Sequence, residues 1–263
     1  MNCLIVYLKF ATMHNMMHIF PILAFEDNYI WILFSSDTKC AVVVDPGMSL
    51  PVIAELEHRN LTLAAILVTH HHYDHTRGIP QLLAYQDVPV YGPSPFCHKA
   101  NDITISDLNV TFSVLSVPGH TQDHLAYAGQ GYVFCGDTLF TGGCGRLFDG
   151  TPVQMFDSLR KLKTLPKKTL VYCGHEYTES NLQFAQIVEP ANSVLKHRIQ
   201  IVKKLTNKKK PTVPASLSLE LATNPFLRTR ESSVCEALQQ QFACSVTDEV
   251  ERFIQLRRWK DNF

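Results

Sequence analysis

The stretch ILVTHHHYDHTRGIP, residues 66–80, places four histidines and one aspartate in six consecutive positions. An apolar run, LAAILV, leads into it and predicts a buried strand that ends at Thr69. A solvent-exposed run of histidines would have no reason to include Asp74 or to follow such a strand. Imidazole and carboxylate groups are, in contrast, common ligands of divalent metal ions. The stretch therefore indicates part of a metal site, and further ligands must come from elsewhere in the chain.

The overall composition is that of a globular protein with a sizeable core. The chain has 263 residues, 46% of them hydrophobic, which is enough for one large domain or two unequal ones. Lysine plus arginine equals aspartate plus glutamate at 24 each, and this balance argues against nucleic acid as the main partner. The eight cysteines form no C-x-x-C pair and are expected to be reduced thiols, because disulfide frameworks are typical of short secreted chains.

Residues 1–17 form an apolar but interrupted segment. Lys9 lies within it, it is too short to span a bilayer, and no small-residue cleavage site of a signal peptide follows. We expect these residues to be either an extension outside the folded domain or the result of an upstream start codon chosen in error. The protein is accordingly expected to be cytoplasmic, to have no membrane partner and to be a monomer.

Short β-branched runs that end in polar turns predict buried strands up to Cys173. The sequence GQG at residues 129–131 predicts a hairpin between two of these strands. Helical periodicity covers SLPVIAELEHR (residues 49–59) and PVQMFDSLRKLKTL (residues 152–165), with Ser49 as the expected N-cap of the first helix. Alternating strands and helices predict an α/β fold.

The pattern changes at about Glu176, after which no further strand is predicted. Residues 181–207 predict one or two helices with a break near Pro190. The last helix is expected to open at SVTD, residues 245–248, which has the spacing of a capping box. We therefore predict a mixed α/β domain over residues 18–176 and a helical domain over residues 177–263.

Polar side chains follow the ends of four predicted strands. The segment after the first strand contributes three histidines and an aspartate, and the other three strands end in SVPGH, CGD and CGH. The seven candidate ligands are His70, His72, Asp74, His75, His120, Asp137 and His175. We expect the four strand ends to share one edge of one sheet, where open α/β sheets bind ligands. Seven ligands are too many for one tetrahedral ion and suit two, which would hold a shared water.

Several motifs resemble the hydroxyacylglutathione hydrolase (glyoxalase II) family of the metallo-β-lactamase superfamily. THHHYDH is similar to the T-H-x-H-x-D-H motif of the superfamily. FEDNYIW, VVDPG, PGHTQDH, GDTLFTGGCGR, CGHEYT, TNPFLR and LRRWKD resemble the family itself, in order along the chain. The resemblance implies an α/β fold of the metallo-β-lactamase type, an αββα sandwich, followed by a smaller C-terminal α-helical domain that binds glutathione.

The resemblance also implies a ligand set and a reaction. One metal would be held by His70, His72 and His120, the other by Asp74, His75 and His175, with Asp137 as the bridge. The ions would be two divalent metals, zinc first, with iron or manganese as alternatives. The reaction would be hydrolysis of the thioester S-D-lactoylglutathione to D-lactate and glutathione, in methylglyoxal detoxification. A metal-bridging hydroxide would attack, with Asp74 and Asp137 as the catalytic carboxylates.

The resemblance implies five substrate contacts, with one departure from the family. The residues are Arg146, Phe148, Tyr177, Arg257 and Lys260. Phe148 stands where the family often has an aromatic hydroxyl, so that contact is in question. Arg257 and Lys260 are three residues apart near the end of a predicted helix and so share a face, with Arg258 pointing elsewhere.

The neighbouring polar residues receive other assignments. His71 and Tyr73 are expected to bind nothing, and His124 is expected to support the site through hydrogen bonds. Asp45 is either a turn residue or a carboxylate that orients a ligand. Three cysteines close to the site in sequence are expected to be buried filler and not catalytic thiols, because a metal hydroxide already supplies the nucleophile. They are Cys135, Cys144 and Cys173.

Three other functions remain as alternatives. A persulfide dioxygenase with one iron, or a β-lactam hydrolase, would use the same scaffold. Neither explains the predicted C-terminal helical domain, and the β-lactam hydrolase would also need a secretory signal. A non-catalytic metal-binding module is disfavoured because no ligand position has been replaced.

Overall fold

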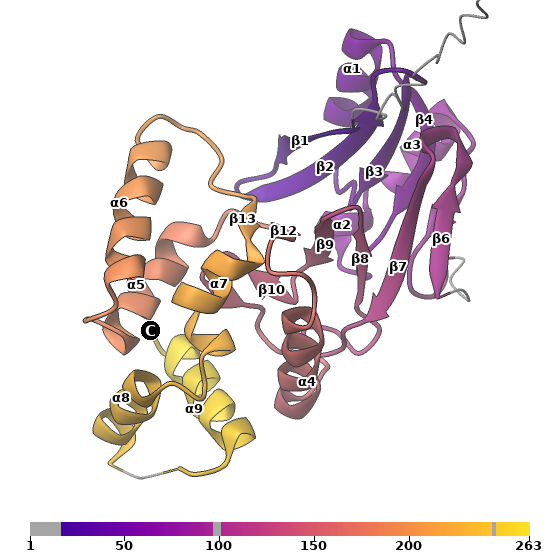
Figure 1. Ribbon diagram of the computed structural model, residues 1–263. Coiled ribbons are helices and arrows are strands. Elements are labelled where there is room, and N and C mark those ends of the chain that lie inside the picture. The colour runs from indigo at the N-terminus through magenta and orange to yellow at the C-terminus, as the bar shows by residue number, and fades with distance from the viewer. Residues whose placement is uncertain (1–16, 97–100, 244–245) are drawn as a thin grey trace, which may run out of the picture.

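The computed structural model describes residues 17–96, 101–243 and 246–263 (Figure 1). Residues 1–16 of the predicted extension lie outside this range, and Met17 is the first residue of strand β1. Within the described ranges, no helix combines the length and the apolar character that a bilayer crossing requires.

The first sheet has five strands in the order β1-β2-β3-β4-β5. They are β1 (Met17–Ala24), β2 (Asn28–Ser35), β3 (Cys40–Val44), β4 (Thr62–Leu67) and β5 (Val90–Tyr91). Alternating side chains of β2 divide between two cores. Ile30 and Ile32 pack with helices α1 (Leu50–Arg59) and α3 (Ile79–Tyr85), whereas Trp31 faces the second sheet.

The second sheet has six strands in the order β13-β12-β9-β8-β7-β6. They are β6 (Asp102–Ile105), β7 (Val110–Ser116), β8 (Leu125–Gly129), β9 (Tyr132–Gly136), β12 (Leu170–Cys173) and β13 (Ala215–Ser216), with the 3-10 turn η1 (Ser106–Leu108) after β6. The predicted hairpin is confirmed, because Gln130 and Gly131 join β8 to β9 with positive φ angles of 47° and 88°.

The two sheets pack face to face through aromatic side chains. The Trp31 ring lies edge-on to Tyr172 at 4.8 Å, and its Nε1 donates to the carbonyl of Cys173 at 2.9 Å. Helix α4 (Pro152–Lys163) adds Met155 and Leu159 to the core on the side of the second sheet. The layers are therefore helix, sheet, sheet, helix, which confirms the predicted αββα sandwich.

The chain after Glu176 is mainly helical and lies beside the sandwich (Figure 1). Its elements are α5 (Thr178–Val188), α6 (Ser193–Thr206), α7 (Leu217–Thr223), the 3-10 turn η2 (Pro225–Leu227), α8 (Ser232–Phe242) and α9 (Glu249–Asp261). We call residues 177–263 the helical region. The predicted break near Pro190 is confirmed between α5 and α6. The helical region contacts α4, where Phe156 packs against Phe253 at 5.8 Å.

Four predictions about local structure are corrected. The helical region does contain a strand, because β13 pairs antiparallel with β12 and extends the second sheet. Ser49 occupies the predicted N-cap position of α1, but its side chain accepts no hydrogen bond from a helix amide, and its hydroxyl donates to Gln81 Oε1. Asp248, not the start of SVTD, caps α9 by accepting from the amide of Glu251 at 2.9 Å.

The fourth correction concerns the strand ends that carry the candidate ligands. They do not belong to one sheet, because β4 lies in the first sheet and β7, β9 and β12 lie in the second. Strands β7, β9 and β12 run in the same direction, so their carboxyl ends share an edge. The candidate ligands therefore gather where that edge meets the end of β4.

Candidate metal centre

The loop after β4 is fixed by a buried carboxylate. Asp45 Oδ1 accepts from the amide of Thr69 at 2.7 Å, and Oδ2 accepts from the Thr69 hydroxyl at 2.7 Å. Beyond Thr69 the chain stays extended to His72, which is the N-cap of the short helix α2 (Tyr73–Thr76). Gly47 packs against this helix so closely that a Cβ atom would lie 1.8 Å from the Asp74 carbonyl oxygen. Because the chain changes from extended to helical at this point, the side chains of His70 and His72 point in a different direction from those of Asp74 and His75.

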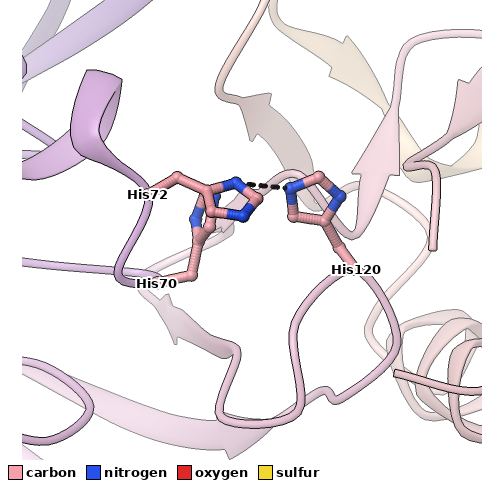
Figure 2. A group of neighbouring side chains, drawn as sticks. All are labelled: His70, His72 and His120. Carbon is pink, nitrogen blue, oxygen red and sulfur yellow. Dashed lines mark hydrogen bonds between the residues drawn. The ribbon is translucent and has the colours of Figure 1, made fainter. Parts of the chain in front are cut away.

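Three histidines form the first donor group. His70, His72 and His120 place one nitrogen each within 4.8 Å of the others (Figure 2). His120 Nδ1 donates to the carbonyl of Arg146 at 2.8 Å, so its Nε2 carries a lone pair, 3.1 Å from His72 Nδ1. His70 Nε2 is buried and has no hydrogen-bond partner among the described residues. An orphaned nitrogen at this position is what a cation would satisfy.

Asp74, His75 and His175 form the second donor group. The Nδ1 atoms of the two histidines are bonded to carboxylates, His75 to Asp45 at 3.1 Å and His175 to Asp27 at 2.8 Å. In the neutral form of each ring, Nε2 carries a lone pair, and the two Nε2 atoms face each other at 3.2 Å. Asp74 Oδ2 lies 3.4 Å from each. A divalent cation among them would satisfy both lone pairs and the carboxylate oxygen.

Asp137 lies between the two groups. Its Oδ2 is 3.5 Å from Nε2 of His120 and 3.2 Å from Nε2 of His175. Its Oδ1 is buried, lies 3.7 Å from His75 Nε2 and has no hydrogen-bond partner among the described residues. Asp137 is thus the one carboxylate of the seven candidates that touches both groups.

The spacing of the donors suits zinc-like coordination. Metal–ligand bonds of about 2.0–2.1 Å in a tetrahedron place ligand atoms about 3.3 Å apart. In the first group His72 Nδ1 and His120 Nε2 are 3.1 Å apart, and in the second group the separations are 3.2 to 3.4 Å. Asp45 also places an oxygen within 4.8 Å of nitrogens of His70 and His75, but its oxygens already accept from Thr69 and from His75 Nδ1. It therefore orients ligands and does not form a third group.

Burial and neighbouring charges shift the pKa values of these side chains in opposite directions. Against the lowering effect of burial, the Asp137 carboxylate raises the pKa values of His75 and His175. Burial lowers the pKa of His70 well below its ordinary value, so the ring is neutral. Burial alone would raise the pKa of Asp137, but the His75 and His175 imidazoles lower it instead. His124 is also neutral, because burial lowers its pKa to about 3.

Besides Asp45, three further residues outside the ligand set hold the ligands in place. His124 Nε2 accepts from the amide of Asp137 at 3.1 Å, as expected of a supporting residue. Asp27 and Asn28 were not predicted, and Asn28 Nδ2 donates to Asp74 Oδ2 at 2.8 Å. Their only signal in the sequence was the motif FEDNYIW, which contains both residues. His71 is exposed and pairs with Asp123 at 3.2 Å, away from the donor groups.

A cavity of about 650 Å³ opens over both donor groups. The five predicted substrate contacts all line it: Arg146, Phe148, Tyr177, Arg257 and Lys260. The Phe148 ring lies edge-on to His72 and His120 at 5.0 and 5.1 Å, and the Tyr177 ring is parallel to His175 at 4.8 Å. Four lining residues were not predicted, Phe140, Ser180, Asn181 and Phe263.

The cations of the cavity are not equivalent. Arg257 is buried, donates to the Cys144 carbonyl at 2.9 Å and pairs with Asp261 at 2.9 Å. Lys260 Nζ donates to the Ser180 carbonyl at 3.2 Å, and Arg146 is exposed. Arg257 is therefore fully engaged by the protein. Arg146 pairs with Asp261 at the longer distance of 3.8 Å, so Lys260 and Arg146 are the cations more accessible to a ligand.

The cysteines near the site have the environment of packing residues. Cys135, Cys144 and Cys173 are all buried. Burial raises the pKa of each thiol, that of Cys173 to about 12, so no thiolate forms at neutral pH.

Comparisons with known proteins agree with this geometry. The family model for the metallo-beta-lactamase superfamily matches residues 25–103 and 98–175, and the model for the hydroxyacylglutathione hydrolase C-terminus matches residues 176–263. The hydroxyacylglutathione hydrolase of Nitrosomonas eutropha is 44% identical over 94% of this chain and 100% of its own length. The chain belongs to the hydroxyacylglutathione hydrolase family. The enzyme of that name from Xanthomonas campestris is 47% identical over 91% of this chain and 96% of its own.

Solved structures show the same fold. The structure of TTHA1623 in a di-iron-bound form superposes with a TM-score of 0.58 at 25% sequence identity, covering 79% of this chain and 100% of that one. Membership of the hydroxyacylglutathione hydrolase family rests on both halves of the chain, because the match to the C-terminal model covers the helical region. The persulfide dioxygenase and β-lactam hydrolase alternatives are not favoured for this reason.

Proposed function

We propose that this chain hydrolyses S-2-hydroxyacylglutathione thioesters, S-D-lactoylglutathione among them, to the 2-hydroxy acid and glutathione. One observation carries the proposal: two donor groups joined by Asp137 open into a cavity that cations also line. The relatives that share nearly the whole chain are named for this activity. The reaction would place the chain in methylglyoxal detoxification.

We propose that two divalent ions bind, one to each donor group, with Asp137 as the bridge. His70, His72 and His120 would hold the first, and Asp74, His75 and His175 the second. Bound there, the ions would supply hydroxide at neutral pH and polarise the thioester carbonyl. Imidazole and carboxylate ligands suit zinc, with iron and manganese as alternatives.

The contribution of the protein's own residues is to hold the metal ligands and to orient their donor atoms. Asp27 and Asp45 accept from Nδ1 of His175 and His75 and so fix the two rings. The Nε2 atoms then face each other in the second donor group and would bind the metal through their lone pairs. Asp74 and Asp137 supply negative charge at the place where the nucleophile forms, and so act as the catalytic carboxylates. A thiol with a pKa near about 8.5 leaves as a thiolate without a dedicated acid.

The cavity lining suits the two ends of the substrate. Phe148 and Tyr177 stand over the histidines of the two groups and form an apolar wall beside the acyl carbon. Phe148 has no hydroxyl, so Tyr177 is the better candidate for a polar contact. Lys260 and Arg146 lie where the carboxylates of a glutathione peptide could pair with them, and Arg257 supports that side of the cavity.

We propose to divide the chain functionally at residues 176 and 177. Residues 18–176 would carry the metal centre, and residues 177–263 would bind glutathione. The cytoplasmic location and the monomeric state stay predictions.

The test is metal content and turnover on one preparation. The purified protein should contain two divalent ions per chain and release glutathione from S-D-lactoylglutathione. Removal of metal with a chelator should abolish turnover, and separate additions of zinc, iron and manganese should show which ion restores it. A protein that loads two ions but cleaves no glutathione thioester would contradict the proposed activity. Oxygen uptake with glutathione persulfide would instead identify the dioxygenase.

A further inference from the structure

The short hairpin between Asp137 and Arg146 is held by the helical region at each of five successive residues. The hairpin consists of β10 (Leu139–Phe140) and β11 (Gly143–Cys144). Asn224 Nδ2 donates to the carbonyls of Phe140 at 3.3 Å and Gly143 at 2.9 Å. Every one of these bonds joins a side chain of the helical region to the backbone of the hairpin.

The remaining contacts follow the same pattern. Glu220 Oε2 accepts from the amide of Gly142 at 2.8 Å. Asn181 Nδ2 donates to the carbonyl of Thr141 at 3.2 Å, and Arg257 to that of Cys144 at 2.9 Å. Backbone groups from residue 140 to residue 144 are thus satisfied from across the interface, which leaves the hairpin little freedom to shift.

Glu220 is the centre of this network. It is fully buried, and it pairs with the buried Arg198, which also bonds to Thr223. A second bond to Glu220 Oε2 comes from Asn224 Nδ2 at 3.1 Å. Because a buried carboxylate is costly unless its oxygens are satisfied, Arg198 and Asn224 hold Glu220 in the one place where it can accept from Gly142.

The hairpin in turn touches both parts of the metal centre. Thr138 directly follows Asp137, and its carbonyl accepts from the amide of Gly145 at 3.3 Å. Gly145 has no space for a side chain, since a Cβ atom would lie 2.0 Å from the Asp137 carbonyl and 3.1 Å from His120 Nδ1. Arg146 then presents the carbonyl that accepts from His120 Nδ1. A shift of the hairpin would therefore move the bridging carboxylate and turn the His120 ring.

We infer that Glu220 and Asn224 are positioning residues of the metal centre, acting through the hairpin. The inference rests on the metal centre proposed above and goes beyond it. The helical region would set metal affinity and the geometry of Asp137 even when no glutathione is bound. Its role would thus be separate from substrate binding.

A buried carboxylate elsewhere in the helical region provides the matched control. Glu189 is buried, pairs with Arg228 at 2.7 Å and accepts from Ser233. Within the described residues, these side-chain bonds all lie in the helical region and none reaches the hairpin. Glu220→Gln and Glu189→Gln therefore make the same chemical change in similar surroundings. Both should lower the melting temperature, but only the first should disturb the metal centre.

The experiment measures zinc affinity by competition with a chelator, and the visible spectrum of cobalt-substituted protein. Glu220→Gln should weaken zinc binding about tenfold or more, the range seen when groups that orient ligands are lost, and should change the cobalt spectrum. Asn224→Asp, which keeps the acceptor for the Phe226 amide, should act in the same direction. Glu189→Gln should leave both readouts unchanged. Equal zinc affinity in the Glu220 and Glu189 variants would overturn the inference.

A second measurement needs only the wild-type protein, so it does not depend on the folding of any variant. Coupling between two sites is reciprocal. Metal addition to the apo-protein should therefore slow hydrogen exchange at the Gly142 amide and in α7, while α1 stays unchanged. If metal addition leaves the rate of hydrogen exchange in α7 unchanged, the inference is refuted. If the wild-type protein binds no metal at all, the proposed function itself is contradicted. This outcome differs from metal binding without a change of exchange in α7, which contradicts only the role of Glu220 and Asn224.

Discussion

Asp27 accepts a hydrogen bond from Nδ1 of His175 at 2.8 Å, across 148 positions of sequence. The aspartate lies in the turn between β1 and β2, and the histidine follows β12, so the bond joins the two sheets. This bond fixes which nitrogen of the His175 ring carries the proton and in which direction the ring faces.

Asp27→Ala should therefore selectively weaken the second donor group. Without the carboxylate, the His175 ring can rotate or change tautomer, and metal affinity should fall about 10- to 100-fold. After dialysis against a chelator, the variant should retain one ion per chain where the wild-type retains two. Asp123→Ala, which removes a carboxylate from the exposed His71, is the control and should retain both. Equal retention by the two variants would show that Asp27 has no such role.

Asp137→Asn should reduce metal content and nearly abolish turnover. An amide lacks the negative charge and is a poor bridge between two cations, and Asp137 is the carboxylate that contacts both donor groups. Metal analysis and thioester assays on the same sample measure both effects. His71→Ala should be nearly silent in both assays. Two metals and a normal rate in Asp137→Asn would eliminate the two-metal assignment.

Lys260→Ala should impair recognition of the glutathione part of the substrate. A hydrogen bond between charged groups contributes about 1.5–3 kcal/mol, so KM for lactoylglutathione should rise about 10- to 150-fold. A thioester without the glutathione peptide should be cleaved at the wild-type rate. Arg258→Ala, at an exposed position of the same helix, is the control. An equal loss on both thioesters would mean that Lys260 does not recognise glutathione.

Arg257→Ala is expected to behave differently from Lys260→Ala. Its guanidinium already bonds to the Cys144 carbonyl and to Asp261. Its loss should lower the melting temperature and reduce turnover on both thioesters, because the hairpin loses a contact. Assays of the two single variants side by side separate recognition from support. A selective loss on lactoylglutathione in Arg257→Ala would assign it to recognition instead.

The binding of substrate should weaken at alkaline pH. Burial, together with the charges of Arg257 and Arg146, lowers the pKa of Lys260 to about 8, against the opposing effects of Cys144 and Asp261. Below that pH Lys260 is charged and attracts a carboxylate, and above it the charge is lost. A bound carboxylate favours the charged form, so KM should begin to rise at about pH 8 or somewhat higher. Lys260→Arg should keep KM flat to higher pH, because arginine stays protonated. A wild-type KM independent of pH from 7 to about 9.5 would contradict this assignment.

The donor residues could be recognised without a structure because each follows a segment whose apolar pattern predicts a strand. His120, Asp137 and His175 each come within a few residues of a strand end, and strand ends gather at edges. The alternation of His70 and His72 on an extended chain is likewise a local property. Local periodicity and spacing were therefore enough to predict an α/β domain and the candidate ligands. The αββα sandwich and the assignment of ligands to two metals were implied by the resemblance to a family.

Other features were decided only by tertiary packing. The partition of the donor strands between two sheets could not be predicted, because strand patterns do not specify partners. Asp27 and Asn28 reach the second donor group only because β1 and β2 pack beside the end of β12. The contacts of Glu220 and Asn224 with the hairpin could not be predicted from the sequence either. They are made to backbone groups, which are nearly the same for every residue. The sequence by itself thus determined which chemical groups could form a metal site, whereas their orientation depends on contacts between distant segments that leave no periodic pattern.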